Sequence, residues 1–216
     1  MKKKKLIILS IITISLLILL CLLYYFNLLP HKKYTNEFFG IKTYVSLIDK
    51  DNDGVDDQTD ILMNARNYIK THPKYKSKYY RSGYPDDSYG VCTDVVAFAF
   101  LDAGYDLREL VNKHINTHRN LYDIDVADKN IDFRRVLNLK IYFDYNAISL
   151  TTDIHKIEEW QGGDIVVFKK HIGIVSDKRN RHGINFVIHP TNPYQKYYEE
   201  DILEHRNDII GHYRIS

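Results

Sequence analysis

Cys92, His171 and His189 are the residues of this chain whose types and positions could together support nucleophilic chemistry. Cys92 opens an apolar segment typical of a buried helix, and main-chain N–H groups at a helix start stabilise a thiolate. His171 begins one β-branched run and His189 ends the next. Adjacent strands can place two histidines side by side, where one acts as a base and the other orients it. The alternatives are a buried inert thiol and histidines of the surface or core.

A second pattern, DKDNDGVDDQTD at 49–60, suits a hard cation. Acids occupy loop positions one, three, five, nine and twelve and a glycine stands at six, as in an EF-hand loop with aspartate for the terminal glutamate. The alternative is a solvated acidic turn that caps the following helix. We predict one structural Ca²⁺, whose ligands are the side chains of Asp49, Asp51, Asp53 and Asp60, the carbonyl of Val55 and a water held by Asp57.

The order of the predicted elements indicates an α+β fold. Apolar residues spaced near 3.6 predict helices at 61–70, 92–104 and 106–118. Residues 74–90 are rich in turn formers, and 133–143 is ambiguous. β-branched runs predict strands at 165–168, 172–175, 184–190 and 208–215. Helices followed by an antiparallel sheet are the α+β arrangement.

The charge distribution argues against nucleic acid as a partner. The 216 residues include 30 Lys and Arg against 28 Asp and Glu, a net charge of +2. Four of the lysines lie at 2–5, so the rest of the chain holds 26 basic residues against 28 acidic ones. A domain that binds nucleic acid normally carries a basic surplus. Because one of the two cysteines, Cys21, lies in an apolar run, no disulfide can form within the folded domain.

Residues 6–29 form an apolar run without a charge. At ~1.5 Å per residue, a helix of this length reaches ~36 Å and can span a bilayer. Tyr24, Tyr25 and Phe26 suit a membrane interface. The lysines at 2–5 favour a cytoplasmic N-terminus, so the prediction is a single-pass anchor in the cell membrane with an extracellular domain.

A cleaved signal peptide is the alternative to this anchor. Its apolar part usually runs ~7–15 residues and ends in a small-x-small site, and no such site occurs near Leu29 and Pro30. Bulky leucine precedes Cys21, where a lipid-attachment site would need a small residue. The predicted organisation is a basic tail at 1–5, an anchor at 6–29, a linker at 30–48, the calcium loop at 49–60 and a domain at 61–216.

Six ordered motifs occur between about Asp60 and Ser216: GVCTDVV, NIDFRRVLNL, W-x-x-GDIVVF, HIGIVSD, VIHP and GHYR. Together they resemble the DUF1287 family of bacterial proteins. That family resembles in turn the NlpC/P60 superfamily of papain-like cysteine peptidases, whose GD-h-h-x-F and H-h-G-h patterns are similar to GDIVVF and HIGIV here. The resemblance implies a papain-like fold, in which N-terminal helices pack on an antiparallel sheet.

The resemblance also implies roles for single residues. Cys92 matches the nucleophile, His171 the base and His189 the residue that orients the base, and Cys92 is expected to be ionised beside a protonated His171. Tyr80 is matched to a substrate-binding tyrosine upstream of the cysteine. NlpC/P60 proteins commonly read D-C-S-G where this chain reads V-C-T-D, so Asp94 either points away from the thiolate or contacts substrate.

Arg134 and Arg135 are further candidates for substrate binding. An arginine can clamp a carboxylate, and the stem peptides of peptidoglycan carry carboxylates. The alternative is a structural salt bridge with a nearby acid.

The leading prediction is a membrane-anchored, extracytoplasmic thiol hydrolase that cleaves an amide bond in peptidoglycan peptides and needs no organic cofactor. One alternative is a non-catalytic cell-wall-binding or signalling module of the same fold. The other is a zinc-dependent hydrolase with Cys92, His171 and His189 as ligands.

Overall fold

The computed structural model describes residues 2–215, which fall into two compact units divided between Lys32 and Lys33. The first unit holds helix α1, Lys2–Tyr25, which has no buried residue and is long and apolar enough to cross a membrane. The helix differs from the predicted 6–29 at both ends. It begins among the lysines, and it stops before Asn27, whose φ of 55° is the left-handed conformation that ends a helix.

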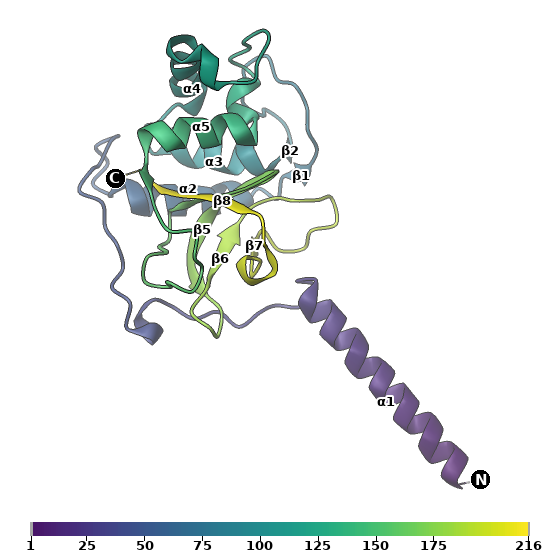
Figure 1. Cartoon of the computed structure of the whole chain (residues 1–216). Helices are drawn as coiled ribbons and strands as arrows, with labels where there is room; N and C mark the ends of the chain where they lie inside the picture. The colour runs from purple at the N-terminus through teal and green to yellow at the C-terminus, as the bar shows by residue number, and fades with distance from the viewer. Residues whose placement is uncertain (1, 216) are drawn as a thin grey trace. The chain divides into compact units, whose positions relative to one another are not determined.

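The second unit is built on a six-stranded sheet with the order β3-β8-β4-β5-β6-β7 (Figure 1). All five strand pairings are antiparallel, which confirms the predicted α+β class. The strands are β3 Ile148–Ser149, β4 Ile165–Phe168, β5 His171–Arg179, β6 Asn185–Ile188, β7 Glu199–Glu200 and β8 Ile209–Arg214.

The helices gather on one side of this sheet (Figure 1). They are α2 Asp57–Ile69, α3 Cys92–Asp102, α4 Leu107–Thr117 and α5 Val136–Asn146. Three of the four match predicted helices, and the ambiguous stretch becomes the 3-10 turn η3, Asp132–Arg134, followed by α5. The turn-rich stretch contains a two-residue parallel pair, β1 Lys74–Tyr75 with β2 Tyr89–Gly90. Further 3-10 turns are η1 Glu37–Phe39, η2 Arg119–Leu121 and η4 Leu203–His205.

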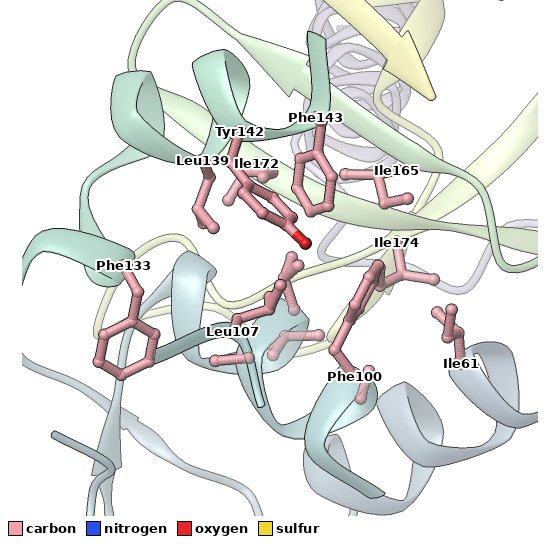
Figure 2. Close-up of a cluster of buried hydrophobic side chains, with 14 of the residues drawn as sticks. Ile61, Phe100, Leu107, Phe133, Leu139, Tyr142, Phe143, Ile165, Ile172 and Ile174 are labelled. Carbon is pink, nitrogen blue, oxygen red and sulfur yellow. The ribbon is translucent and has the colours of Figure 1, made fainter. Parts of the chain in front are cut away.

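Side-chain alternation along the strands divides the core into two layers. Toward the helices, Ile172 and Ile174 of β5 pack with Ile165 of β4 against Phe100 and Phe143, as Figure 2 shows. The opposite face carries a smaller cluster, which consists of Trp160, Val166, Phe168, Val175, Ile184, Val187 and Leu203. Successive residues of β4 and of β5 therefore point alternately toward the helices and toward the smaller cluster on the opposite face.

The segment predicted as a linker, 30–48, is instead part of the folded unit from Lys33 onward. Asn36 is buried, accepts a 2.6 Å hydrogen bond from Nε of Arg179 and donates a 3.0 Å hydrogen bond to Gln161. Tyr34 forms a β-bridge with Arg179. The polar composition suggested a free linker because its buried partners lie far away in the sequence.

Candidate active site

Cys92 is the first residue of α3, and the chain enters the helix through the extended Val91. The cysteine is only 7% exposed. Main-chain N–H groups of Ile172 and Thr93 lower the pKa of its thiol against the effect of burial. The pairing of β5 with β6 begins only at Ile174, so the sheet is open beside Ile172 where the helix end arrives. The thiol therefore lies near the main chain directly after His171.

The two candidate histidines are joined by a hydrogen bond of 2.9 Å between Nε2 of His171 and Nδ1 of His189. His171 begins β5, and His189 directly follows β6, the neighbouring strand. They are 8% and 2% exposed. Because His171 uses Nε2 for this bond, Nδ1 is its nitrogen available for a reacting group.

Cys92 and His171 approach β5 from different sides. The side chain of Ile172 lies in the cluster that contains Cys92, whereas the ring of His171 lies 5.8 Å from Phe168 of the opposite cluster. Within residues 2–215, no hydrogen bond joins the thiol to the imidazole. The structure therefore brings the two histidines together and places the thiol near the main chain of Ile172. The thiol and the His171 ring do not form a hydrogen bond.

The pKa values of the three groups favour their neutral forms. Burial raises the pKa of the Cys92 thiol to about 11, although the N–H groups of Ile172 and Thr93 oppose this rise. Burial lowers the pKa of His171 to about 2, helped by His189 and Arg206. Burial also lowers the pKa of His189 to about 3. These directions oppose the expected thiolate–imidazolium pair and favour a neutral thiol beside a neutral base in this closed arrangement.

Glu200 extends the histidine pair, and the sequence reasoning missed it. Its Oε2 lies 3.4 Å from Nε2 of His189. Gln195 ties the two together, since its Nε2 donates 3.1 Å to Oε2 of Glu200 and 2.9 Å to the His189 carbonyl. The signal in the sequence was the acidic run EED at 199–201, in which Glu200 is buried.

Asp94 and Arg134, both predicted to bind substrate, instead bind each other. Arg134 donates from Nε and Nη2 to the two carboxylate oxygens of Asp94 at 2.6 and 2.9 Å, and the side chains are 2% and 0% exposed. Asp94 also accepts a 2.8 Å hydrogen bond from the N–H of Val91. A fully paired, buried carboxylate is not available to substrate, so this pair positions the helix start that carries Cys92.

The other two predicted substrate contacts lie apart. Tyr80 is buried, donates a 2.9 Å hydrogen bond to Asp87 and has the Arg134 guanidinium 5.1 Å from its ring centroid. Arg135 keeps a 55% exposed side chain. Burial, and then the interaction with Cys92, raises the pKa of Tyr75, a tyrosine that was not among the predicted site residues. Its place in the turn-rich stretch gave no signal.

The motifs W-x-x-GD and GHYR meet at Asp164. This buried carboxylate accepts hydrogen bonds of 2.7 and 2.8 Å from Arg214 and lies 2.9 Å from Nε2 of His212. The ring of His212 stacks on Trp160 at 3.7 Å. These contacts give both motifs a structural role on the sheet.

The acidic loop converges as its pattern predicts. Asp49, Asp51 and Asp53 bring carboxylate oxygens within 4.8 Å of one another, and Gly54 adopts a φ of 95°. Asp60 is buried, and its Oδ2 has no hydrogen-bond partner. Burial and then the charges of the other loop acids raise the pKa of Asp60 to about 6.

The ninth position differs from the prediction. Both carboxylate oxygens of Asp57 have protein partners, since one accepts 2.7 Å from the N–H of Lys50 and the other accepts from the Tyr105 hydroxyl. Asp57 therefore anchors the loop to the turn between α3 and α4. Sequence reasoning could not see this, because Tyr105 lies outside the loop.

Fold and site together define an α+β domain with a cysteine at a helix start and paired histidines on neighbouring strands. The model of the family described as a domain of unknown function (DUF1287) matches residues 62–215, and the chain belongs to this family, which confirms the family resemblance. One relative is the uncharacterized protein YijF of Escherichia coli (strain K12), 34% identical over 151 residues that cover 66% of this chain and 72% of that protein. No solved structure matches the chain.

Proposed function

We propose that this protein is a membrane-anchored thiol hydrolase that cleaves an amide bond, with Cys92 as nucleophile, His171 as base and His189 as the residue that orients the base. The observation that carries the proposal is the hydrogen bond between His171 Nε2 and His189 Nδ1, directly before Ile172, whose main-chain N–H acts on the pKa of the Cys92 thiol. Because Nε2 is used in this bond, Nδ1 of His171 is the nitrogen that can accept a proton from the thiol. The resemblance to NlpC/P60 peptidases, where the same residue types occur in the same order, supports it.

The reaction begins from a neutral pair. On substrate binding, Nδ1 of His171 takes the thiol proton as the sulfur attacks the carbonyl carbon. The oxygen of the tetrahedral intermediate gains the negative charge, and the N–H of Cys92 at the helix start stabilises it. The intermediate collapses when His171 gives the proton to the leaving amine. Water, deprotonated by His171, then releases the acid and restores the thiol.

Because the pKa of His171 is low, the proposed reaction requires that His171 become more basic when substrate is bound. A buried base becomes more basic when a neighbouring group stabilises its protonated form. A neutral His189 can supply that stabilisation, because its Nδ1 can accept from the protonated Nε2 of His171, whereas a charged His189 lowers the pKa of His171. The Glu200 carboxylate lies 3.4 Å from the other nitrogen of His189. We expect the thiol and the imidazole to come into contact only when substrate binds.

The substrate we propose is a peptide of peptidoglycan. An apolar N-terminal helix long enough to cross a membrane, with lysines at its start, supports a domain on the outer side of the membrane, where this polymer lies. Superfamily members outside the membrane act on the same peptides, so this step rests on resemblance.

The test is incubation of the full-length chain, in detergent micelles, with purified peptidoglycan. Fragments are identified by mass. We expect new amine and carboxylate ends at one type of peptide bond, and none with Cys92→Ala. Cleavage that persists in Cys92→Ala contradicts the proposal.

A second candidate, a cell-wall-binding module without activity, is favoured by the enclosure of the thiol and the open thiol–imidazole contact. It predicts binding to peptidoglycan that is equal for wild type and Cys92→Ala and releases no fragment. A zinc hydrolase is less favoured, because the facing nitrogens of His171 and His189 are bonded to each other.

A further inference from the structure

The acidic loop 49–60 lies outside the residues matched by the family model and takes no part in the proposed hydrolysis. We infer that it binds one Ca²⁺ through the carboxylates of Asp49, Asp51, Asp53 and Asp60 and the carbonyl of Val55. This metal site is separate from the proposed hydrolase activity, and a test of one does not decide the other.

The loop is already folded around the point where its acids meet. Asp49 accepts hydrogen bonds from the N–H groups of Asp53 and Gly54 at 3.2 and 2.9 Å, and Asp53 accepts 2.8 Å from the N–H of Val55. These bonds curl the main chain so that oxygens from three side chains lie within 4.8 Å of one another. A hard cation with flexible coordination, as calcium has, suits a set of oxygens only.

Asp60 is the independent observation that points to a ligand. It is 7% exposed, and its Oδ2 has no hydrogen-bond partner. Asp60 follows Asp57 by three residues on the same face of α2. Asp57 accepts a hydrogen bond from the N–H of Lys50, which stands between Asp49 and Asp51. The Asp60 carboxyl therefore lies on the side of the cluster. Burying a carboxylate oxygen without a partner is costly, and a divalent cation shared with the three loop acids removes that cost.

The inferred ion has a structural consequence at the far end of α3. Gly104 follows that helix with a φ of 82°, and a side chain there would come within 3.1–3.4 Å of Lys50 and Asp51. Asp57 reaches the same turn through the Tyr105 hydroxyl. Calcium would thus hold the loop against the turn that ends α3, while Cys92 starts that helix at its opposite end.

The test is titration of the full-length chain in detergent micelles with Ca²⁺, followed by calorimetry. A second readout is Tb³⁺ luminescence excited through tyrosine, because Tyr105 contacts the loop. We expect one Ca²⁺ per chain with a dissociation constant of ~10⁻⁴–10⁻³ M and displacement of Tb³⁺ by Ca²⁺. Asp51→Asn, at an exposed position, should weaken binding about tenfold or more, and so should Asp60→Asn.

Asp125→Asn is the matched control, because Asp125 is an exposed aspartate that does not belong to the loop. It should bind as wild type does. Melting in chelator shows whether each variant is folded, and Asp51→Asn keeps the test valid if Asp60→Asn does not fold. Absence of Ca²⁺ binding by the folded wild type, or equal affinity in folded Asp51→Asn, overturns the inference. A negative result for calcium binding does not count against the hydrolase proposal, which the peptidoglycan assay tests separately.

Discussion

His171 and His189 lie on the same side of neighbouring strands, with Nε2 of the first 2.9 Å from Nδ1 of the second. The bond fixes the orientation of the His171 ring and leaves Nδ1 as the ring nitrogen that takes no part in it. Glu200 stands 3.4 Å from the far nitrogen of His189, which has no hydrogen-bond partner. In the proposed function these three groups form a relay from the carboxylate through the two imidazoles toward the Cys92 thiol.

Substitutions along this relay should reduce peptidoglycan cleavage in a fixed order. Cys92→Ala should remove turnover, and His171→Ala should lower it by ~10²–10⁴-fold because general-base catalysis is lost. His189→Ala should cost less, since His171 keeps its own nitrogen. Released fragments are quantified by mass for each variant, and His155→Ala, at an exposed histidine, is the control. A larger loss in His189→Ala than in His171→Ala would assign the roles the other way round.

The buried histidines should make stability depend on pH. Their folded pKa values lie below the ordinary 6.5, so below that pH the unfolded chain takes up protons that the folded chain refuses. The stability they provide is present above about pH 6.5 and falls as pH decreases, by up to about 1.4 kcal/mol per pH unit for each histidine. Melting temperatures of wild type, His171→Gln and His189→Gln between pH 7 and 4.5 test this. Variants with the same slope as wild type would show that neither ring is buried in its neutral form.

The Asp94–Arg134 pair should act on stability rather than on substrate affinity. Arg134→Ala leaves the Asp94 carboxylate buried without its partner, so it should cost about 3–5 kcal/mol of unfolding free energy. Arg135→Ala, at an exposed neighbour, should change it by less than about 0.5 kcal/mol. Urea unfolding compares the two. If Arg134→Ala is as stable as Arg135→Ala and only the KM for peptidoglycan rises, Arg134 is a substrate contact after all.

Those two residues also illustrate what the sequence could not reveal. Asp94 and Arg134 are forty positions apart, and Asn36 meets Arg179 across a still longer interval. No local period encodes such a partner. From the sequence alone, each of these polar residues therefore looked like a residue of the surface or of a functional site, and only the fold identified its buried partner.

Elements with a single strong local signal were predictable. The apolar run from Cys92 ends near Gly104, and α3 occupies Cys92–Asp102; the run 165–168 is β4 residue for residue. The stretch that became α5 was ambiguous because VLNLKIYFDYN places residues that favour strands, such as valine, isoleucine and tyrosine, at helical spacing. The positions of Cys92, His171 and His189 followed from these elements, whereas the open thiol–imidazole contact depends on which strand face each residue occupies.

The proposed membrane anchor predicts the topology of the chain. Protease added to intact wall-free cells should remove the domain, because the lysines at 2–5 favour an N-terminus in the cytoplasm. Immunoblotting of the domain and of a cytoplasmic protein measures this, and the cytoplasmic protein should survive. A protected domain would reverse the orientation, and a mature N-terminus near residue 30 would show a cleaved signal peptide instead.

The central claim, that His171 is the base for Cys92, is tested most directly by the rate of single-turnover cleavage of a purified peptidoglycan peptide against pH. This measurement probes the substrate complex, in which the thiol–imidazole contact is expected to close. At pH 7 wild type should react ~10²-fold or more faster than His171→Ala, and His155→Ala should match wild type. The difference should shrink as pH rises toward the raised pKa of the thiol, where the thiol ionises without a base. Equal rates at pH 7 with and without His171 would contradict the assignment of Cys92 and His171 as a catalytic pair.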